Sequence, residues 1–187
     1  MATSAIPSNV ASRAQGPVRR SLPAGTRGDE TASSRGPLER SVGEMHHASV
    51  LKHLVLQLGQ HEREWRIRVL PRQNVQVSHL RSRVADVAVA KRETGYEPTL
   101  VTPPLLVVEV LCDDDRMAGS HELISDYVEM GVQAVWVVDP KRRRAYAAEG
   151  GMPLLEQRED LTVSGTAIRV PVLELFAELD EMEFVIE

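Results

Sequence analysis

Two acidic residues stand inside otherwise apolar stretches that have the composition of β-strands. Asp86 lies within residues 82–89 (SRVADVAV), and Glu109 lies within residues 105–111 (LLVVEVL). A carboxylate is costly to bury in a sheet unless it is hydrogen-bonded, paired with a cation or bound to a metal ion. Two carboxylates on neighbouring strands therefore predict a divalent-metal site with hard oxygen ligands, and such a site favours hydrolytic chemistry.

Other interpretations of the charged residues stay open at this point. Asp86 and Glu109 could form a structural ion pair with Arg83 or Lys91. The histidines at positions 46, 47 and 53 resemble a metal cluster, but zinc there would need further ligands at fixed spacing. The basic run 141–144 is typical of a solvated hairpin turn, although a basic turn beside a metal site could also contact phosphates.

Regular elements must position the two acidic residues. Apolar residues at helical spacing predict a helix over 46–64. Three short antiparallel strands are expected at 67–70, 75–78 and 84–90, with Pro71 and a polar turn between them, and 105–111 has the pattern of a buried central strand.

The second half of the chain alternates helix and strand. A helix is expected from about 118 to 130 with Gly131 as its C-terminal cap, followed by a buried strand at 135–138 and its hairpin partner at 145–147. A further meander at 154–170 precedes a terminal helix that begins after Pro171. This order predicts an α+β domain with a mixed β-sheet flanked by helices.

Composition limits the class of protein. The chain of 187 residues can build one domain, and residues 37–187 are expected to form it. Residues 1–36 are rich in Ser, Ala, Gly, Pro and Arg without an amphipathic period, and are expected to be a disordered tail. The net charge of −5 disfavours a strongly basic nucleic-acid binder but allows a local basic patch. The single Cys112 excludes an internal disulfide and favours the cytoplasm, and no stretch is apolar enough to predict a membrane partner.

Several short motifs occur in an order that resembles a known family. They are SVGE at 41–44 with His47, RVADV at 83–87, PPLL and EVL at 103–111, DRM at 115–117, DY at 126–127, and VWVVDP at 135–140 after a Gly-Val pair. This pattern resembles the Uma-type restriction-endonuclease family, a bacterial branch of the PD-(D/E)XK nuclease superfamily. The resemblance covers roughly residues 38–177.

The resemblance implies a restriction-endonuclease-like fold and hydrolysis of DNA phosphodiester bonds. Asp86 and Glu109 match the residues that bind Mg²⁺ in the superfamily, with Mn²⁺ as the alternative ion. His47 matches a histidine on the first helix near the catalytic site. The implied partner is DNA, and a homodimer is a further expectation.

This sequence also departs from the family pattern. Ala85 replaces the proline before the catalytic aspartate, and Cys112-Asp113 replaces Ser-Pro. Leu111 replaces the lysine of the Glu-X-Lys pattern, and Leu123 stands where relatives have Lys or Arg on the second helix. Loss of one such charge commonly costs on the order of 100- to 1000-fold in rate.

The missing lysine predicts an endonuclease of weakened activity. Arg116, Lys91 and His121 are the candidate replacements, none at the expected position. The alternative is a catalytically degenerate relative that acts as a nucleic-acid-binding or protein-interaction module. A third hypothesis is a structural oligomer whose strand edges pair with a second copy.

Overall fold

The computed structural model describes residues 42–112 and 117–184. In these residues the elements follow the order α1 (Val42–Gln60), β1 (Ile67–Ser78), β2 (Arg81–Lys91), β3 (Leu106–Val110), α2 (Met117–Met130), β4 (Ala134–Asp139), β5 (Arg144–Glu149), β6 (Leu155–Gln157), β7 (Asp160–Thr162), β8 (Arg169–Pro171) and α3 (Val172–Phe184). The predicted tail at 1–36 and the acidic residues 113–115 lie outside the described residues.

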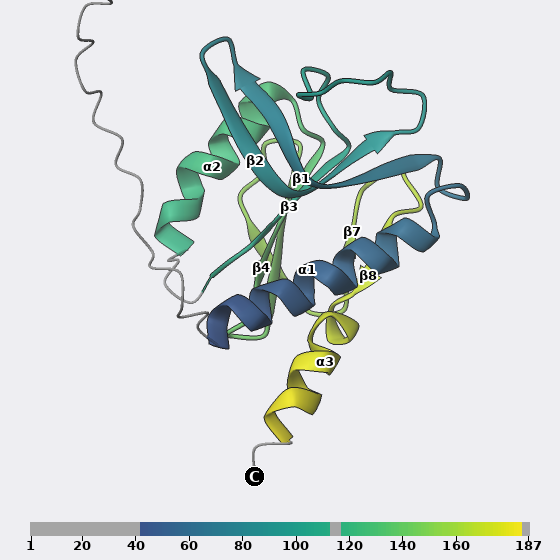
Figure 1. The fold of residues 1–187 in the computed structure, drawn as a ribbon. Helices are drawn as coiled ribbons and strands as arrows, with labels where there is room; N and C mark the ends of the chain where they lie inside the picture. The colour runs from purple at the N-terminus through teal and green to yellow at the C-terminus, as the bar shows by residue number, and fades with distance from the viewer. Residues whose placement is uncertain (1–41, 113–116, 185–187) are drawn as a thin grey trace, which may run out of the picture. The chain divides into compact units, whose positions relative to one another are not determined.

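Six strands form one mixed sheet in the order β1-β2-β3-β4-β5-β6 (Figure 1). Neighbouring strands are antiparallel except β3 and β4, which run parallel and are joined through α2. Strands β7 and β8 form a separate two-stranded sheet instead of extending one meander. The mixed sheet and its flanking helices confirm the predicted α+β fold class.

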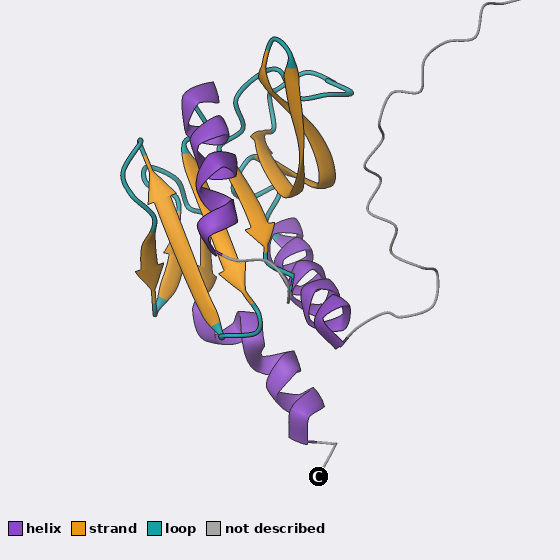
Figure 2. Cartoon of the chain, turned by 90° about the vertical axis from the view of Figure 1, so that its left-hand side faces the viewer, coloured by secondary structure: helices purple, strands orange, loops and turns teal. Residues whose placement is uncertain are grey.

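The helices cover both faces of the central strands (Figure 2). One face of β3 and β4, which includes Val108 and Trp136, packs in a core with α1, α3 and the small sheet. The opposite face, which includes Val107 and Val135, packs against α2. This burial on both faces explains why the two strands have continuous apolar sequences.

Helix α1 is built on an apolar stripe, with Val50, Leu54 and Leu58 fully buried at intervals of four residues. The helix ends at Gln60, four residues before the predicted end. Residues 61–66 form turns. Arg66 has a φ of 55°, a left-handed conformation that a right-handed α-helix does not contain.

The prediction of three strands before residue 91 is wrong, because 67–70 and 75–78 belong to the single strand β1. Pro71 was taken as a break, yet it pairs across the ladder with Val87. A proline is tolerated here because β1 is the edge strand of the sheet, where one row of backbone groups has no partner strand. The two strands β1 and β2 therefore form one long hairpin (Figure 1).

Near its middle, the β1–β2 hairpin switches the face of the sheet on which its apolar side chains are buried. Val69 and Val87 pack on the α1 side, whereas Val75 and Ala85 pack on the α2 side. Around the change, the ladder pairs residues 71 with 87 and 73 with 85 but skips the position between them, where Arg72 has a φ of 53°. Strand β2 pairs with β3 only over residues 87–89, so β2 leaves β3 at Asp86.

The basic turn between β4 and β5 has its charges largely paired. Arg142 contacts Asp139 at 2.8 Å, and Arg143 contacts Asp180 and Glu183 of α3 at 3.0 and 2.7 Å. These ion pairs dock α3 beside the turn. They leave less of this positive charge for a phosphate than the sequence alone suggests.

Candidate functional site

The carboxylate of Asp86 is buried, with 8 % of its side chain exposed, and accepts three hydrogen bonds. His47 Nε2 of α1 lies 3.2 Å from Oδ2, and Arg72 of β1 donates to Oδ1 at 3.0 Å. The backbone N–H of Val110 on β3 donates to Oδ2 at 3.0 Å. This last contact gives the Val110 N–H an acceptor at a point where the backbone of β2 no longer pairs with β3.

These donors hold Asp86 in its ionised form. Burial alone raises the pKa of this carboxyl, but hydrogen bonds from His47, Val110 and Arg72, together with the charge of His47, lower the pKa below its ordinary value. The alternative pairing of Asp86 with Arg83 is not observed, because Arg83 contacts Asp126 at 2.6 Å. Lys91 lies exposed at the far end of β2.

Glu109 lies in a contrasting environment on β3. The Tyr127 hydroxyl of α2 donates to Glu109 Oε1 at 2.7 Å. Burial raises the pKa of Glu109 to about 7, the Tyr127 hydrogen bond opposes that rise, and the nearby charge of Asp86 adds to it. The phenol is buried against the same carboxyl, and its own pKa is raised by that burial and by Glu109.

The two carboxylates lie just beyond the end of the β2–β3 ladder. Val87 and Val108 form its last pair, and Asp86 and Glu109 are the next residues on the two strands. The partners of Asp86 come from α1 and β1, while the partner of Glu109 comes from α2. The site thus lies where β2 and β3 separate, and its two carboxylates have partners from helices on opposite faces of the sheet.

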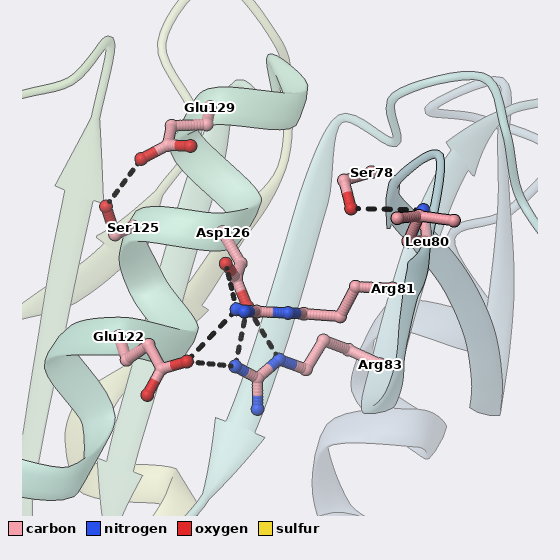
Figure 3. Close-up of polar contacts among 8 residues, drawn as sticks. All are labelled: Ser78, Leu80, Arg81, Arg83, Glu122, Ser125, Asp126 and Glu129. Atoms are coloured by element: carbon pink, nitrogen blue, oxygen red, sulfur yellow. Dashed lines mark hydrogen bonds and ion pairs between the residues drawn. The ribbon is translucent and has the colours of Figure 1, made fainter.

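A cluster of ion pairs fixes α2 against the hairpin beside this site (Figure 3). Arg81 contacts Glu122 and Asp126 at 3.0 and 2.9 Å, and Arg83 contacts Asp126 at 2.6 Å. Asp126 directly precedes Tyr127, so the same helical turn that receives both arginines also presents the phenol to Glu109. The cluster therefore helps to position one of the two carboxylates.

Apolar residues occupy both positions where the family pattern expects a cation. Leu111 is 7 % exposed at the end of β3, and Leu123 packs against the α2-side core one turn before Tyr127. Of the replacements considered from sequence, His121 is exposed on α2 and Arg116 lies outside the described residues. The structure instead brings Arg72 to the site.

Sequence reasoning did not assign two residues, Arg72 and Tyr127, to the site. Arg72 follows Pro71, between two segments that the sequence predicts as separate strands, and Tyr127 enters the sequence analysis only as part of the DY motif. Tyr127 is fully buried, as is Trp136, and its hydroxyl nevertheless reaches Glu109. The signal for Tyr127 was its buried position with a polar hydroxyl, since a buried phenol usually finds a hydrogen-bond partner.

Within residues 42–112 and 117–184, no three His, Cys, Asp or Glu side chains form a cluster suited to metal binding. This finding disfavours the histidine cluster at 46, 47 and 53 as a zinc site, which needs three or four protein ligands. A pair of carboxylates does suit Mg²⁺, because that ion keeps several waters and commonly uses only one or two protein carboxylates. Asp86 and Glu109 are such a pair.

The mixed six-stranded sheet with flanking helices fits a restriction-endonuclease-like fold. The family model Uma2, described as "Putative restriction endonuclease", matches residues 26–175. The chain belongs to this family, which confirms the resemblance found in the sequence.

A solved structure supports the same fold. The crystal structure of a "putative nuclease belonging to DUF820" from Anabaena variabilis aligns with a TM-score of 0.64 at 16 % identity, covering 76 % of this chain and 84 % of that chain. No curated protein matches the chain. Among the described helices, none has the length and apolar character that a membrane span requires.

Proposed function

We propose that this protein is a Mg²⁺-dependent DNA endonuclease whose activity is weakened by the lack of the active-site lysine. The observation that carries the proposal is the carboxylate pair Asp86 and Glu109, which lies just beyond the end of the β2–β3 ladder and is close enough for the charge of Asp86 to act on Glu109. Membership of a restriction-endonuclease family and the nuclease-like fold support the same reaction.

Each residue of the site has a distinct role in this proposal. Asp86 and Glu109 hold the divalent ion, with Mn²⁺ as the alternative to Mg²⁺. When bound, such an ion acidifies water and offsets the negative charge of the phosphate. His47 keeps the Asp86 carboxylate in place through its 3.2 Å contact, and Tyr127 does the same for Glu109 at 2.7 Å.

The second candidate function is a degenerate nuclease fold that binds DNA or a protein without cleaving. The observation that favours it is the burial of Leu111 and the packing of Leu123 in the core, since neither position offers a charge to water or phosphate. A location in the cytoplasm and a homodimer also remain proposals. Light scattering on the purified chain measures the oligomeric state.

Cleavage of supercoiled plasmid DNA tests the proposed function. The wild type is compared in Mg²⁺, Mn²⁺ and EDTA with Asp86→Asn and Glu109→Gln. A matched control is Asp160→Asn, because Asp160 also pairs with one arginine but lies on β7 in the small sheet. We expect slow nicking that needs the divalent ion, persists in the control and is lost in both site variants.

The outcome separates the two candidate functions. Nicking that survives in folded Asp86→Asn and Glu109→Gln contradicts the proposed catalytic site. DNA binding without cleavage in any divalent ion supports the degenerate module instead. Circular dichroism spectra of all variants check that lost activity does not reflect lost structure.

A further inference from the structure

Arg72 places a guanidinium directly at the candidate site from the edge strand β1. Its position is opposite Asp86 in the β1–β2 hairpin, and its guanidinium donates to Asp86 Oδ1 at 3.0 Å. The backbone φ of 53° is unfavourable for a residue with a side chain, and such conformations tend to persist where the surrounding structure or the function requires them.

The exposure of the two partners is very unequal. The Arg72 side chain is 66 % exposed, whereas the Asp86 side chain is 8 % exposed. The cation thus stands at the solvent side of a buried acid. Its charge also lowers the pKa of Glu109, so it acts electrostatically on both carboxylates. Because Asp86 also has contacts to His47 and to the backbone N–H of Val110, its charge stays compensated when the exposed guanidinium turns to another anion.

Two other arginines of the hairpin form ion pairs with an acid on α2. Arg81 and Arg83 both contact Asp126 on α2, and the Arg83 side chain is only 27 % exposed. Leu111 and Leu123 supply no charge at the positions where the family pattern expects one. Among the side chains that the structure describes, Arg72 is therefore the cation best placed to meet an anion that approaches Asp86 and Glu109.

We infer that Arg72 is the substrate-phosphate-binding residue of this site, paired with Asp86 until a DNA phosphate enters and then transferred to that phosphate. The inference rests on the proposed function and deepens it. A planar guanidinium can donate two parallel hydrogen bonds to a phosphate, so the exchange of partner keeps its charge compensated. Because Arg72 approaches from β1 and not from β3 or α2, it supplies substrate binding without restoring the missing lysine.

Binding of DNA without cleavage tests this role. The probe is a fluorescein-labelled 20-base-pair duplex, followed by anisotropy in EDTA over a salt series. The variants are Arg72→Gln and Arg72→Lys. The matched control is Arg169→Gln, since the Arg169 side chain is also 66 % exposed and pairs with one aspartate, in the small sheet.

We expect Arg72→Gln to weaken binding by about three- to tenfold and to reduce the slope of log affinity against log salt by about 1. Arg72→Lys retains most of that slope because the charge remains. The Arg169→Gln control binds like the wild type. A purely structural role for Arg72 would leave the salt slope unchanged.

A double-mutant comparison tests the exchange of partner. Asp86→Asn removes the carboxylate that competes for Arg72, so it should tighten DNA binding. The gain should largely disappear when Arg72→Gln is added. An equal gain with and without Arg72 would show that only the loss of a negative charge matters, and that result would overturn the inference.

Failure of the inference and failure of the proposed function differ in outcome. Wild-type binding that Arg72→Gln leaves unchanged overturns the role of Arg72 alone. Absence of DNA binding in the wild type and in folded Asp86→Asn overturns the proposed function and this inference with it. Melting curves of each variant confirm that the compared proteins are folded.

Discussion

Asp86 and Glu109 both lie just beyond the last pair of the β2–β3 ladder, yet their pKa values are shifted in opposite directions. The Asp86 side is rich in donors, from α1, from the bent edge strand β1 and from the backbone of β3. The Glu109 side offers a single phenolic donor from α2 within a buried environment. The pKa of Asp86 is therefore lowered, whereas the pKa of Glu109 is raised to about 7.

The difference shows how the protein lowers the cost of placing two acids close together inside the sheet. If both were ionised and unpaired, their repulsion and desolvation would be costly. The protein instead compensates one charge with fixed donors and leaves the other acid able to take up a proton. The donors that stabilise ionised Asp86 come from α1, β1 and β3, whereas the donor to Glu109 comes from α2. Substitutions can therefore change the surroundings of one carboxyl group without changing the donors of the other.

The largest expected effect is an opposite pH dependence of Glu109→Gln and Asp86→Asn. The pKa of Glu109 rises from 4.5 to about 7 on folding, so the wild type loses stability as the pH rises through this window. Glu109→Gln removes that loss, and its unfolding free energy at pH 8 should exceed that of the wild type by roughly 3 kcal/mol. Urea unfolding at pH 5 and pH 8 measures the change.

Asp86→Asn is expected to change the unfolding free energy in the opposite direction to Glu109→Gln. The pKa of Asp86 is lowered from 3.8, so its stabilising effect is present above pH 3.8 and is lost as the pH falls through the lowered pKa. The substitution should destabilise the protein at pH 8 and matter less in acid. Two variants with the same sign at pH 8 would contradict the contrast between the carboxylates.

The next effect concerns the missing charge on the Glu109 side. Leu123 lies one turn before Tyr127 and packs partly buried in the α2-side core. We expect Leu123→Lys to raise Mg²⁺-dependent nuclease activity about tenfold or more, since one positioned charge is commonly worth 100- to 1000-fold. The lost apolar contact costs less than the roughly 1.5–3 kcal/mol of a fully buried leucine. Plasmid nicking rates measure the gain.

Two controls accompany this gain of activity. Adding Asp86→Ala to Leu123→Lys should abolish it, because the same carboxylate pair is needed. His121→Lys adds an exposed lysine on the same helix and should not reproduce it. A folded Leu123→Lys protein with no gain would mean that the site lacks more than this charge.

The sequence was sufficient to predict the strands that carry the two acids. Asp86 and Glu109 interrupt apolar runs, and such runs are local signals of buried strands. The cap at Gly131, which has a φ of 95°, was predictable for the same reason, because glycine tolerates the left-handed conformation that ends a helix. The predicted order of helices and strands then indicated a mixed sheet flanked by helices, and the sheet topology confirms that fold class.

The partners of the acids were not predictable by local reasoning. Arg72 reaches Asp86 only because β1 continues through Pro71 and bends where the hairpin changes the face it buries. A proline is a strong local signal for a break, and only its place on an edge strand removes the conflict. Likewise, the Tyr127–Glu109 contact depends on how α2 docks on the hairpin through Asp126.

A smaller effect should follow from Tyr127→Phe. The variant loses the hydrogen bond to Glu109 Oε1 while keeping the buried ring. Because that bond lowers the pKa of Glu109, its removal should move the pKa further above 7 and cost about 1 kcal/mol or more at high pH. The exposed Tyr96→Phe is the matched control. An unchanged pH dependence of unfolding would show that the phenol does not tune Glu109.

The smallest effect is expected from deletion of residues 1–36, which tests whether both halves of the site belong to a domain that folds without them. This segment contains Arg13, Arg19, Arg20, Arg27 and Arg35 and lacks an amphipathic apolar pattern, so it offers little surface to bury. The deletion should change the melting temperature by less than about 2 °C, as expected for a terminus that makes no packed contacts. The family match begins at residue 26, ten residues before the predicted boundary, which makes this boundary worth measuring. If the deletion lowers the melting temperature strongly, and by the same amount in the wild type and in Glu109→Gln, residues 26–36 belong to the folded domain. If the melting temperature is unchanged, the stability of the site comes from the elements from α1 onward.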